Sequence, residues 1–487
     1  MGGEGWGSGE DLAGIVTGAG LKAAISPSHA ELVVAESTIL RQFPRMKLLR
    51  NPIRLVPSLF LLAIAVGTLL LSLPIATADG TRAPFLTALF TATSAVAVTG
   101  LVLVDTGTYW SPIGQVVILL MFQIGGLGIM TAATLFGLLA GRGFGLHDRI
   151  ATQVERGRLE RGDALSVLKL VLGVTLAVEA VIALVLTIRM AAAYDMSLGA
   201  ALWNGVFHAI SAFNNAGFST HADSVMGYQS DPLILIPIMS AITLGAIGFP
   251  VMQDLRDKRF DWRRWSLHSK VTVYGSAALL VLGFAAILAM EWNNAATLGP
   301  MGLGGKVLNA AFHSVMPRTA GFNSLDVGAF RESTLMVNYL LMFIGGGSAG
   351  TAGGIKVTTF IVLFAIVLAE VQGRRDVGLF GRRFGHEVER QALTVTVIAA
   401  ALVVAATTYI VAITGLPLAE VLFECISAFA TVGMSTGITA DLPPSAQVVI
   451  VLLMFIGRVG TITFATALAM GTSPQLYRYP KENLIVG

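Results

Sequence analysis

Long apolar stretches alternate with short ones along most of this chain, and charged positions separate them. Eight stretches reach or approach the roughly 20 residues that an α-helix needs to cross a bilayer. They are residues 55–75, 111–140, 164–188, 231–253, 267–290, 333–369, 391–414 and 445–470. The pattern predicts an all-α polytopic membrane protein with eight transmembrane spans.

A shorter apolar stretch lies between the two long ones of each successive pair. Its length is too small to span the hydrocarbon core and suits a re-entrant helix. The four short stretches are 84–98, 198–213, 302–316 and 417–430. The order of span, short pore helix, glycine turn and span therefore defines repeats A to D, at residues 55–140, 164–253, 267–369 and 391–470.

The short stretches share a Phe, a Ser and a Gly. In repeats A, B and D the Gly follows the Phe by 10 residues and the Ser by 6; in repeat C, which carries Met316-Pro317, these spacings are 9 and 7. The residues are Phe90, Ser94 and Gly100; Phe207, Ser211 and Gly217; Phe312, Ser314 and Gly321; Phe423, Ser427 and Gly433. Matches at a fixed offset favour an internal duplication. Each unit starts and ends on the same side of the membrane, so four parallel units can surround one central pore.

The positive charges fall on one side of the predicted membrane. Of the 32 lysines and arginines, 24 lie in residues 1–54, 141–163, 254–270, 370–390 and 471–487, and five, including Arg318, are expected on the opposite face. The positive-inside rule then places both termini in the cytosol. Residues 1–54 are expected to form a cytosolic N-terminal arm, and residues 471–487 a cytosolic C-terminal tail.

Composition agrees with a membrane protein and excludes several classes. Hydrophobic residues make up 54% and charged residues only 13% of the chain, about half the charged share of a soluble globular protein. The single cysteine, Cys425, excludes an intrachain disulfide framework and a cysteine zinc site. The sequence has no HExxH, P-loop or dinucleotide motif. We expect no enzyme activity, no cofactor in this chain, no structural metal and no nucleic-acid partner.

The four glycine turns are the candidate site. A filter that replaces the water shell of an ion needs backbone carbonyls aimed at the axis, and glycine most readily adopts the positive φ that this requires. The candidate filter residues are Val98, Thr99, Gly100, Asn215, Ala216, Gly217, Thr319, Ala320, Gly321, Thr431, Val432 and Gly433. The alternative is that each glycine only permits a tight re-entrant turn.

The turn Thr431-Val432-Gly433 resembles a potassium-channel filter, and the other three resemble degraded copies of it. From about residue 50 onward the pattern resembles the Trk/Ktr/HKT superfamily of potassium transporters, and most of all KtrB-type membrane subunits. This resemblance implies potassium uptake, with potassium bound at the filter glycines. Glycine in the first turn, at Gly100, implies a preference for potassium over sodium.

The resemblance also implies partners and a location. It implies a homodimer in the cell membrane, the inner membrane of a bacterium, docked on a separate cytosolic nucleotide-binding ring of the RCK type, similar to KtrA. It leaves open whether sodium is coupled or only modulatory. The alternative function is a cation-coupled symporter of a different polar solute. Such a transporter is expected to have inverted repeats, and carboxylates near the middle of the membrane.

The sixth apolar stretch contains a candidate gate. As one helix its 37 residues would run to roughly 55 Å, well beyond the ~30 Å hydrocarbon core. A glycine-rich run must break it, since glycine disfavours a helix. We expect an intramembrane gating loop beneath the filter, the alternative being a flexible kink without a gating role. Its residues are Gly345, Gly346, Gly347, Ser348, Ala349, Gly350, Thr351, Ala352, Gly353 and Gly354.

Arg458 is the candidate charge beside this gate. It follows Gly433 by 25 residues, as Gly346 follows Gly321, so Arg458 and the loop should lie at a similar depth. An arginine within a span faces the protein interior or water. Its charge would be a barrier to potassium and could hold the loop carbonyls. The alternative is a purely structural tie.

Other polar positions have two interpretations each. The acids that follow the turns, Asp105, Asp223, Asp326 and Asp441, would concentrate cations at the mouth or are ordinary loop acids. Glu179, within a predicted span, is expected to bond a polar group between units. His208 and His313 follow the pore-helix Phe where Thr91 and Glu424 stand in repeats A and D. This substitution pattern indicates packing or hydrogen bonding, not metal ligation.

Overall fold

The computed structural model describes residues 52–140, 161–259, 261–374 and 376–460. Residues from Val56 onward belong to one compact unit, distinct from Met1–Leu55, and the description below concerns that unit. Four predictions lie wholly or mostly outside the described residues. They concern the N-terminal arm, the basic segment 141–163, the end of the last apolar stretch and the C-terminal tail.

The long apolar stretches form helices of very different lengths. Three of the described helices, α7 over Lys169–Ala193, α11 and α15, are long and apolar enough to cross a membrane, and α9 with α10 makes a fourth if the bent pair is one span. The eight-span arrangement therefore stays a prediction. The bounds are α2 Pro52–Leu71, α5 Pro112–Ala140, α7 Arg161–Ala193, α9 Pro232–Ile247, α10 Phe249–Lys258, α11 Leu267–Glu291, α13 Glu332–Phe343, α14 Val357–Val371, α15 His386–Thr414 and α17 Pro444–Phe455.

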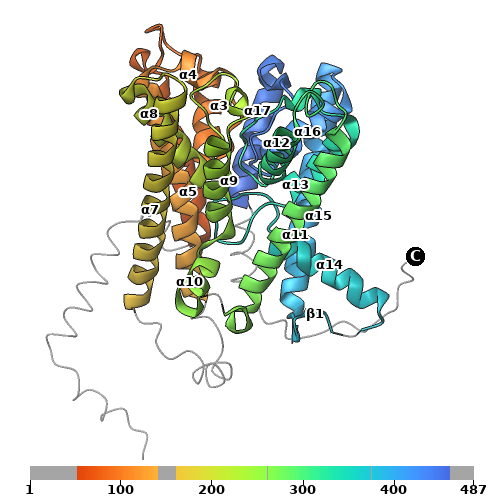
Figure 1. Cartoon of the computed structure of the whole chain (residues 1–487). Helices are drawn as coiled ribbons and strands as arrows, with labels where there is room; N and C mark the ends of the chain where they lie inside the picture. Colours follow the sequence, from red (N-terminus) through yellow and green to blue (C-terminus); the bar gives the residue numbers. More distant parts are fainter. Residues whose placement is uncertain (1–51, 141–160, 260, 375, 461–487) are drawn as a thin grey trace, which may run out of the picture. The chain divides into compact units, whose positions relative to one another are not determined.

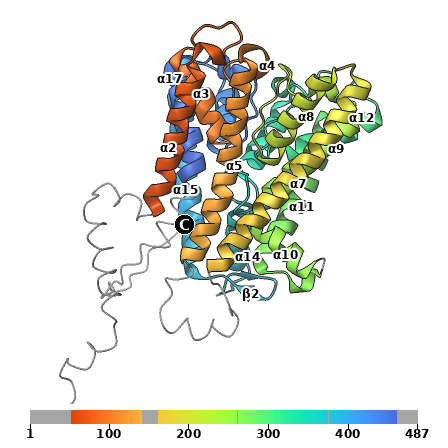
Figure 2. The ribbon, with the colours of Figure 1, turned by 90° about the vertical axis from the view of Figure 1, so that its left-hand side faces the viewer.

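Each of the four short apolar stretches also forms a helix. These pore helices gather at one end of the unit, the upper end in Figures 1 and 2, while α10 and α14 lie at the lower end. Prolines precede two of them, and Ser197 caps a third by accepting the Ala200 N–H at 3.3 Å. Their bounds are α3 Phe85–Val96, α8 Leu198–Phe213, α12 Leu303–Val315 and α16 Leu418–Phe429.

Short elements connect these helices. β1 (Gly378–Leu379) and β2 (Arg382–Arg383) form a two-stranded antiparallel hairpin in which Gly378 pairs with Arg383. The other elements are η2 Pro74–Ala76, α4 Thr106–Tyr109, η3 Met226–Tyr228, η4 Trp262–Arg264, η5 Val327–Ala329, η6 Ile438–Asp441 and the π-turn η7 Ile456–Gly460.

The repeated aromatic and sulfur positions form the core. The pore-helix residues Phe90, Phe207, Phe312 and Phe423 are all fully buried. Phe122 ends a Leu-Leu-Met-Phe segment, 119–122, that recurs at 340–343 and 452–455. Its ring stacks on Phe218 with centroids 5.9 Å apart and meets Phe207 edge to face at 5.6 Å. The repeated phenylalanines of the pore helices are thus core residues, and Phe122 links the pore helix and turn of repeat B to repeat A.

The fourth apolar stretch, predicted as a span over 231–253, does not form one straight helix. It breaks at Gly248, where α9 and α10 meet at 94°. Gly248 has φ +90, and a Cβ there would lie 3.1 Å from the backbone nitrogen of Gly350. Only glycine fits both the backbone conformation and the space, so the bend is set by this residue together with the glycine-rich loop 345–354 that lies against it.

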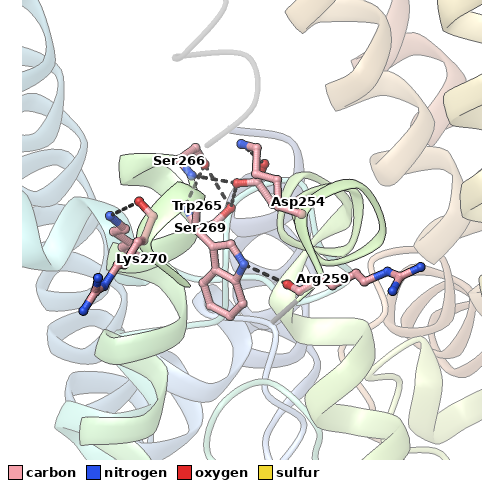
Figure 3. Close-up of polar contacts among 8 residues, drawn as sticks. Asp254, Arg259, Trp265, Ser266, Ser269 and Lys270 are labelled. Carbon is pink, nitrogen blue, oxygen red and sulfur yellow. Dashed lines mark hydrogen bonds and ion pairs between the residues drawn. The ribbon is translucent and has the colours of Figure 1, made fainter. Parts of the chain in front are cut away.

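The bend is also fixed on the far side of α10. The carboxylate of Asp254 accepts the Ser266 backbone N–H at 2.9 Å and the Ser269 hydroxyl at 2.6 Å (Figure 3). These groups form the first turn of α11, whose unpaired N–H groups favour a negative charge. The Trp265 indole donates to the Arg259 carbonyl at 3.0 Å and closes the connection between the two helices.

Arg318 was expected on the outer face, and the structure corrects this. The residue is 5% exposed and lies directly after α12, just before the third glycine turn. Its guanidinium donates to the hydroxyl of Ser276 on α11 at 2.9 Å and to the Ser276 carbonyl at 3.3 Å. The spacing of charges along the sequence cannot distinguish a loop arginine from one folded back between helices.

Candidate functional site

All four glycine turns have the same unusual backbone. The first and third residues of each turn have positive φ, which is uncommon for residues other than glycine. The angles are 56° and 92° at Val98 and Gly100, 59° and 71° at Asn215 and Gly217, 69° and 73° at Thr319 and Gly321, and 52° and 89° at Thr431 and Gly433. Repeat C shares this conformation in spite of its irregular spacing. A common path of this kind can direct the carbonyl groups of four turns at one axis.

The turn glycines follow one another in a closed ring. A Cβ built on Gly100 would lie 3.2 Å from the Cα of Gly217, and one on Gly217 would lie 3.0 Å from the Cα of Gly321. A Cβ built on Gly321 would lie 3.2 Å from the Cα of Gly433. One built on Gly433 would lie 3.0 Å from the Cα of Gly100, which closes the ring. Glycine is therefore required at these positions both for its φ and for the close approach of its neighbour.

The repeated serine joins each pore helix to its turn in three repeats. Ser94 accepts the Gly100 N–H at 3.0 Å, Ser211 donates to the Phe218 carbonyl at 2.8 Å, and Ser427 donates to the Met434 carbonyl at 2.6 Å. These contacts explain the constant spacing of six residues from serine to glycine.

Repeat C joins its turn in a different way. Ser314 instead donates to the Leu280 carbonyl of α11 at 2.5 Å, and the backbone N–H of Ala320 donates to the Met316 carbonyl at 3.1 Å. The irregular spacing in this repeat therefore reflects a different attachment, while the backbone of the turn is kept.

One cavity of about 430 Å³ opens onto all four turn glycines. Asp105, Asp223 and Asp326 line it, whereas Asp441 is not among its lining residues. Asp105 also accepts the Thr108 N–H at 2.6 Å, and Asp326 accepts the Gly328 N–H at 2.9 Å. Asp105 and Asp326 thus face the mouth and shape their own loops, so the two interpretations of these acids are compatible.

His221 adds no positive charge to this mouth at neutral pH. It lines the cavity, and its Nε2 lies 3.1 Å from the Tyr228 hydroxyl. Burial lowers the pKa of His221 below its usual 6.5, although Asp223 and Asp105 act in the opposite direction. The imidazole is therefore neutral at pH 7, and the aspartates dominate the charge of the mouth.

The glycine-rich run 345–354 forms a loop between α13 and α14. Its two ends are adjacent, since the Gly345 N–H donates to the Ile355 carbonyl at 2.8 Å. The loop is fixed to the end of α9 by two further bonds: Gly347 donates to the Ala246 carbonyl at 2.8 Å, and Thr351 to the Gly245 carbonyl at 3.2 Å. The predicted break in the sixth apolar stretch is thus a hydrogen-bonded loop.

This loop lies against the first residue of three turns. The Thr351 hydroxyl donates to Asn215 Oδ1 at 2.9 Å, and the Gly353 N–H donates to the Thr319 hydroxyl at 3.3 Å. A Cβ on Gly353 would lie 3.1 Å from the Cβ of Thr431. The mouth cavity borders the glycines at the other end of the same turns, so the ring separates the mouth from the loop.

Arg458, just after the C-terminal end of α17, contacts the loop. It lies in the π-turn η7, is 2% exposed, and donates from Nη1 to the Thr351 carbonyl at 2.5 Å. The Lys356 ammonium donates to the next carbonyl, that of Ala352. The predicted contact between Arg458 and the loop carbonyls is present, and two basic side chains face consecutive carbonyl groups.

The sequence profile of the TrkH family, described as cation transport proteins, matches residues 63–479. The chain belongs to this family. The family resemblance drawn from the turns is thereby confirmed, and the chain is placed among transport proteins, the class that the sequence predicted in place of an enzyme.

Relatives of this TrkH-family chain align over nearly their whole length. The Ktr system potassium uptake protein B of Bacillus subtilis is 39% identical over 88% of this chain and 95% of its own length. The potassium/sodium uptake protein NtpJ of Enterococcus hirae is 33% identical over 92% of this chain and 100% of its own. The crystal structure of the potassium transporter TrkH from Vibrio parahaemolyticus has the same fold, with a TM-score of 0.64 at 18% identity, over 87% of this chain and 86% of that one.

Two amides that the sequence analysis did not single out complete a polar cluster between repeats A and B. Glu179, on α7, is 6% exposed and accepts from Gln123 of α5 and from Asn214 at the end of α8, both at 3.2 Å. Asn214 also donates to Gln123 Oε1 at 2.5 Å. The expected role of Glu179 between units is confirmed. A polar residue directly after the repeated Leu-Leu-Met-Phe was the available signal for Gln123.

Of the two pore-helix histidines, His208 forms hydrogen bonds and His313 packs against an aromatic ring. His208 contacts the Asn204 carbonyl at 2.8 Å and the Ser219 hydroxyl at 2.9 Å. His313 meets the ring of Phe330 edge to face, with centroids 5.1 Å apart. Both contacts are of the kinds expected from the substitution pattern. Among the described residues there is no cluster of three or more metal-ligating side chains.

Proposed function

We propose that this chain takes up potassium across the cell membrane through one central path, with the ring of four turns as its selectivity filter. The closed ring of glycines carries the proposal. It joins four segments that are far apart in sequence, and each has the same left-handed backbone. Relatives with the names potassium uptake protein and potassium/sodium uptake protein align over almost the whole chain.

The filter would bind potassium through backbone carbonyl groups in place of water. The twelve residues of the four turns supply them, and the glycines allow the turns to approach closely. Three of the four turns depart from the sequence of a potassium-channel filter, so fewer regular ion sites are expected. The aspartates at the mouth would raise the local concentration of cations.

The loop 345–354 would obstruct the path directly beneath the filter. Its hydrogen bonds to Asn215 and Thr319 place it against the inner end of the turns. Arg458 would hold it there through the Thr351 carbonyl and add a positive charge at the same level. Opening then requires the loop to leave these partners.

The finer architecture belongs to the same proposal. Four parallel repeats would supply eight spans and four re-entrant helices around the pore, with both termini in the cytosol. The family relation supports a homodimer on a separate nucleotide-binding ring, with sodium as a coupling or modulating ion. A symporter of another polar solute would need a solute site away from the axis. The buried carboxylate of Glu179 already has two amide partners, which does not favour such a site.

Flux in proteoliposomes tests the proposal directly. Purified protein is reconstituted, and uptake of potassium, rubidium and sodium is compared at equal gradients. Potassium and rubidium should enter well ahead of sodium, and potassium uptake should restore growth of a transporter-deficient host at low potassium. Equal uptake of all three ions would contradict the filter, and uptake of an organic solute coupled to a cation would favour the symporter.

A further inference from the structure

Glu424 is a fully buried acid on the pore helix α16, directly after the repeated Phe423. One carboxylate oxygen accepts the Ser435 hydroxyl at 2.5 Å and the Thr436 backbone N–H at 3.0 Å. The other accepts the Thr439 hydroxyl at 2.7 Å. A carboxylate is costly to bury unless its oxygens are satisfied, and here donors from Ser435, Thr436 and Thr439 converge on it.

Ser435 and Thr436 belong to the segment that follows the filter turn of repeat D, residues 434–437, which is called the outgoing strand below although it forms no β-sheet. Ser435 and Thr436 stand two and three residues after Gly433. Ser427, one turn further along the same helix, donates to the Met434 carbonyl at 2.6 Å. The outgoing strand of repeat D is therefore tied to its pore helix at two successive levels, by a serine beside the turn and by Glu424 nearer the mouth.

Repeats B and C have outer ties of related geometry. In repeat B, His208 occupies the position of Glu424 and contacts Ser219, two residues after its turn glycine, at 2.9 Å. In repeat C, Asn309, one turn earlier on its pore helix, accepts the hydroxyl of Ser324, three residues after its turn glycine, at 2.6 Å. Glu424 is the acidic member of this set.

Repeat A differs from the other three. Thr91 occupies the position of Glu424, and Val102 stands two residues after Gly100. Within the part of the chain that the structure describes, the buried Thr91 hydroxyl has no hydrogen-bond partner. Turn A lies in the ring between Gly433 of repeat D and Gly217 of repeat B. A shift of Gly433 would therefore reach Gly100 directly.

We propose that Glu424 is a positioning residue of the filter: it fixes the outgoing strand of repeat D and, through the contact of Gly433 with Gly100, the position of turn A. This inference rests on the proposed potassium filter. A filter discriminates between ions through the number and placement of its carbonyl groups. Loosening this one tie therefore changes ion preference more than it changes total flux.

Variants of the acid and of its donor test the tie. Ser435→Ala removes one donor and leaves the acid, whereas Glu424→Gln keeps the volume of the side chain but replaces one acceptor oxygen by an amide donor. Each should lower the ratio of potassium to sodium uptake in proteoliposomes by about tenfold. Because the two groups share one hydrogen bond, the double variant should lose little more than either single variant.

Two matched variants serve as controls. Thr91→Val alters the same position in the repeat without the tie. Glu420→Gln makes the same chemical change one helical turn earlier on α16, where no contact with the outgoing strand is described. Both should keep the ion ratio of the wild-type protein. Hydrogen exchange of residues 434–440 gives a second readout that does not need transport, and it should accelerate in Ser435→Ala and Glu424→Gln only.

The outcomes separate this inference from the proposed function. A wild-type protein that prefers potassium, together with unchanged ion ratios in both tie variants, would overturn the role of Glu424 and leave the filter intact. Fully additive losses in the double variant would also overturn it. If Glu424→Gln yields no folded protein, Ser435→Ala and Thr439→Val decide. A wild-type protein without ion preference would refute the potassium filter, and exchange in 434–440 would then show whether the tie itself is real.

Discussion

Gly433 illustrates at the residue scale how little space the ring leaves for a side chain. Its φ is +89, and an added Cβ would meet the Cα of Gly100 at 3.0 Å. Gly437, four residues later, also has a positive φ of 104° but nothing within 4 Å of an added Cβ. The two glycines have the same backbone preference, and only Gly433 carries the additional demand of the neighbouring turn.

The first residue-scale prediction concerns Gly100, where φ is +92 and an added Cβ would lie 3.2 Å from the Cα of Gly217. Gly100→Ser should lower the preference for potassium over sodium about tenfold, because turns A and B must move apart. Relative uptake of the two ions in proteoliposomes measures this. Gly173→Ser makes the same change on α7, where nothing lies within 4 Å of an added Cβ; it is the control and should keep the preference. Unchanged preference in Gly100→Ser would contradict the filter assignment.

The second prediction concerns Arg458, whose guanidinium holds the Thr351 carbonyl. Arg458→Gln should raise potassium flux by up to about tenfold, since one charge-assisted hydrogen bond to the loop and one positive charge beneath the filter are lost. Initial rates of rubidium uptake measure the effect. Arg318→Gln is a matched control, because Arg318 is equally buried but bonds Ser276 on α11. An increase in both variants would mean that general loosening is the cause.

At the scale of elements, the loop between α13 and α14 can be removed without separating the two helices. Its ends are already joined by the bond from Gly345 to Ile355, so deletion of 345–354 leaves a short gap to close. The deletion should leave the path constitutively more open and raise basal potassium flux. Thr351→Val, which removes the hydrogen bond to Asn215 but keeps the loop, should produce a smaller increase.

The same uptake assay checks both loop variants. Thr351→Ser keeps the hydroxyl and should behave like the wild-type protein. If flux in the deletion variant equals that of the wild type while protein amounts are equal, the loop is a structural kink and not a gate.

For the whole molecule, the ring exists only when four distant segments meet. Potassium that binds there therefore binds the folded state and stabilises it, by about 2.7 kcal/mol at a concentration 100 times the dissociation constant. Thermal unfolding of the detergent-solubilised protein should shift upward in potassium chloride, less in sodium chloride, and not in choline chloride. Equal midpoints in all three salts would mean that the folded protein binds no potassium in preference to sodium or choline, and would contradict the filter.

Much of the fold could be predicted because the repeats encode it locally. A stretch of 12 to 16 apolar residues that begins after proline, glycine or a serine cap specifies a pore helix in each of the four repeats. The break at 345–354 was predictable from glycine content. The bend at Gly248 was not, because a single glycine in an apolar stretch is usual, and here its effect depends on the loop that lies against it.

The candidate site likewise has parts that the sequence predicts and parts that only the tertiary structure shows. The sequence alone determined the turn residues, the repeated serine and the arginine at loop depth, because these follow from spacing within one segment. Only the tertiary structure decided the order of the glycines in the ring, the contacts of the loop with Asn215 and Thr319, and the outer tie at Glu424. The ring and the loop contacts join residues of different repeats, up to hundreds of positions apart, and packing between repeats chooses their partners. The tie at Glu424 lies within repeat D, but it forms only where the chain folds back along the pore helix after the turn.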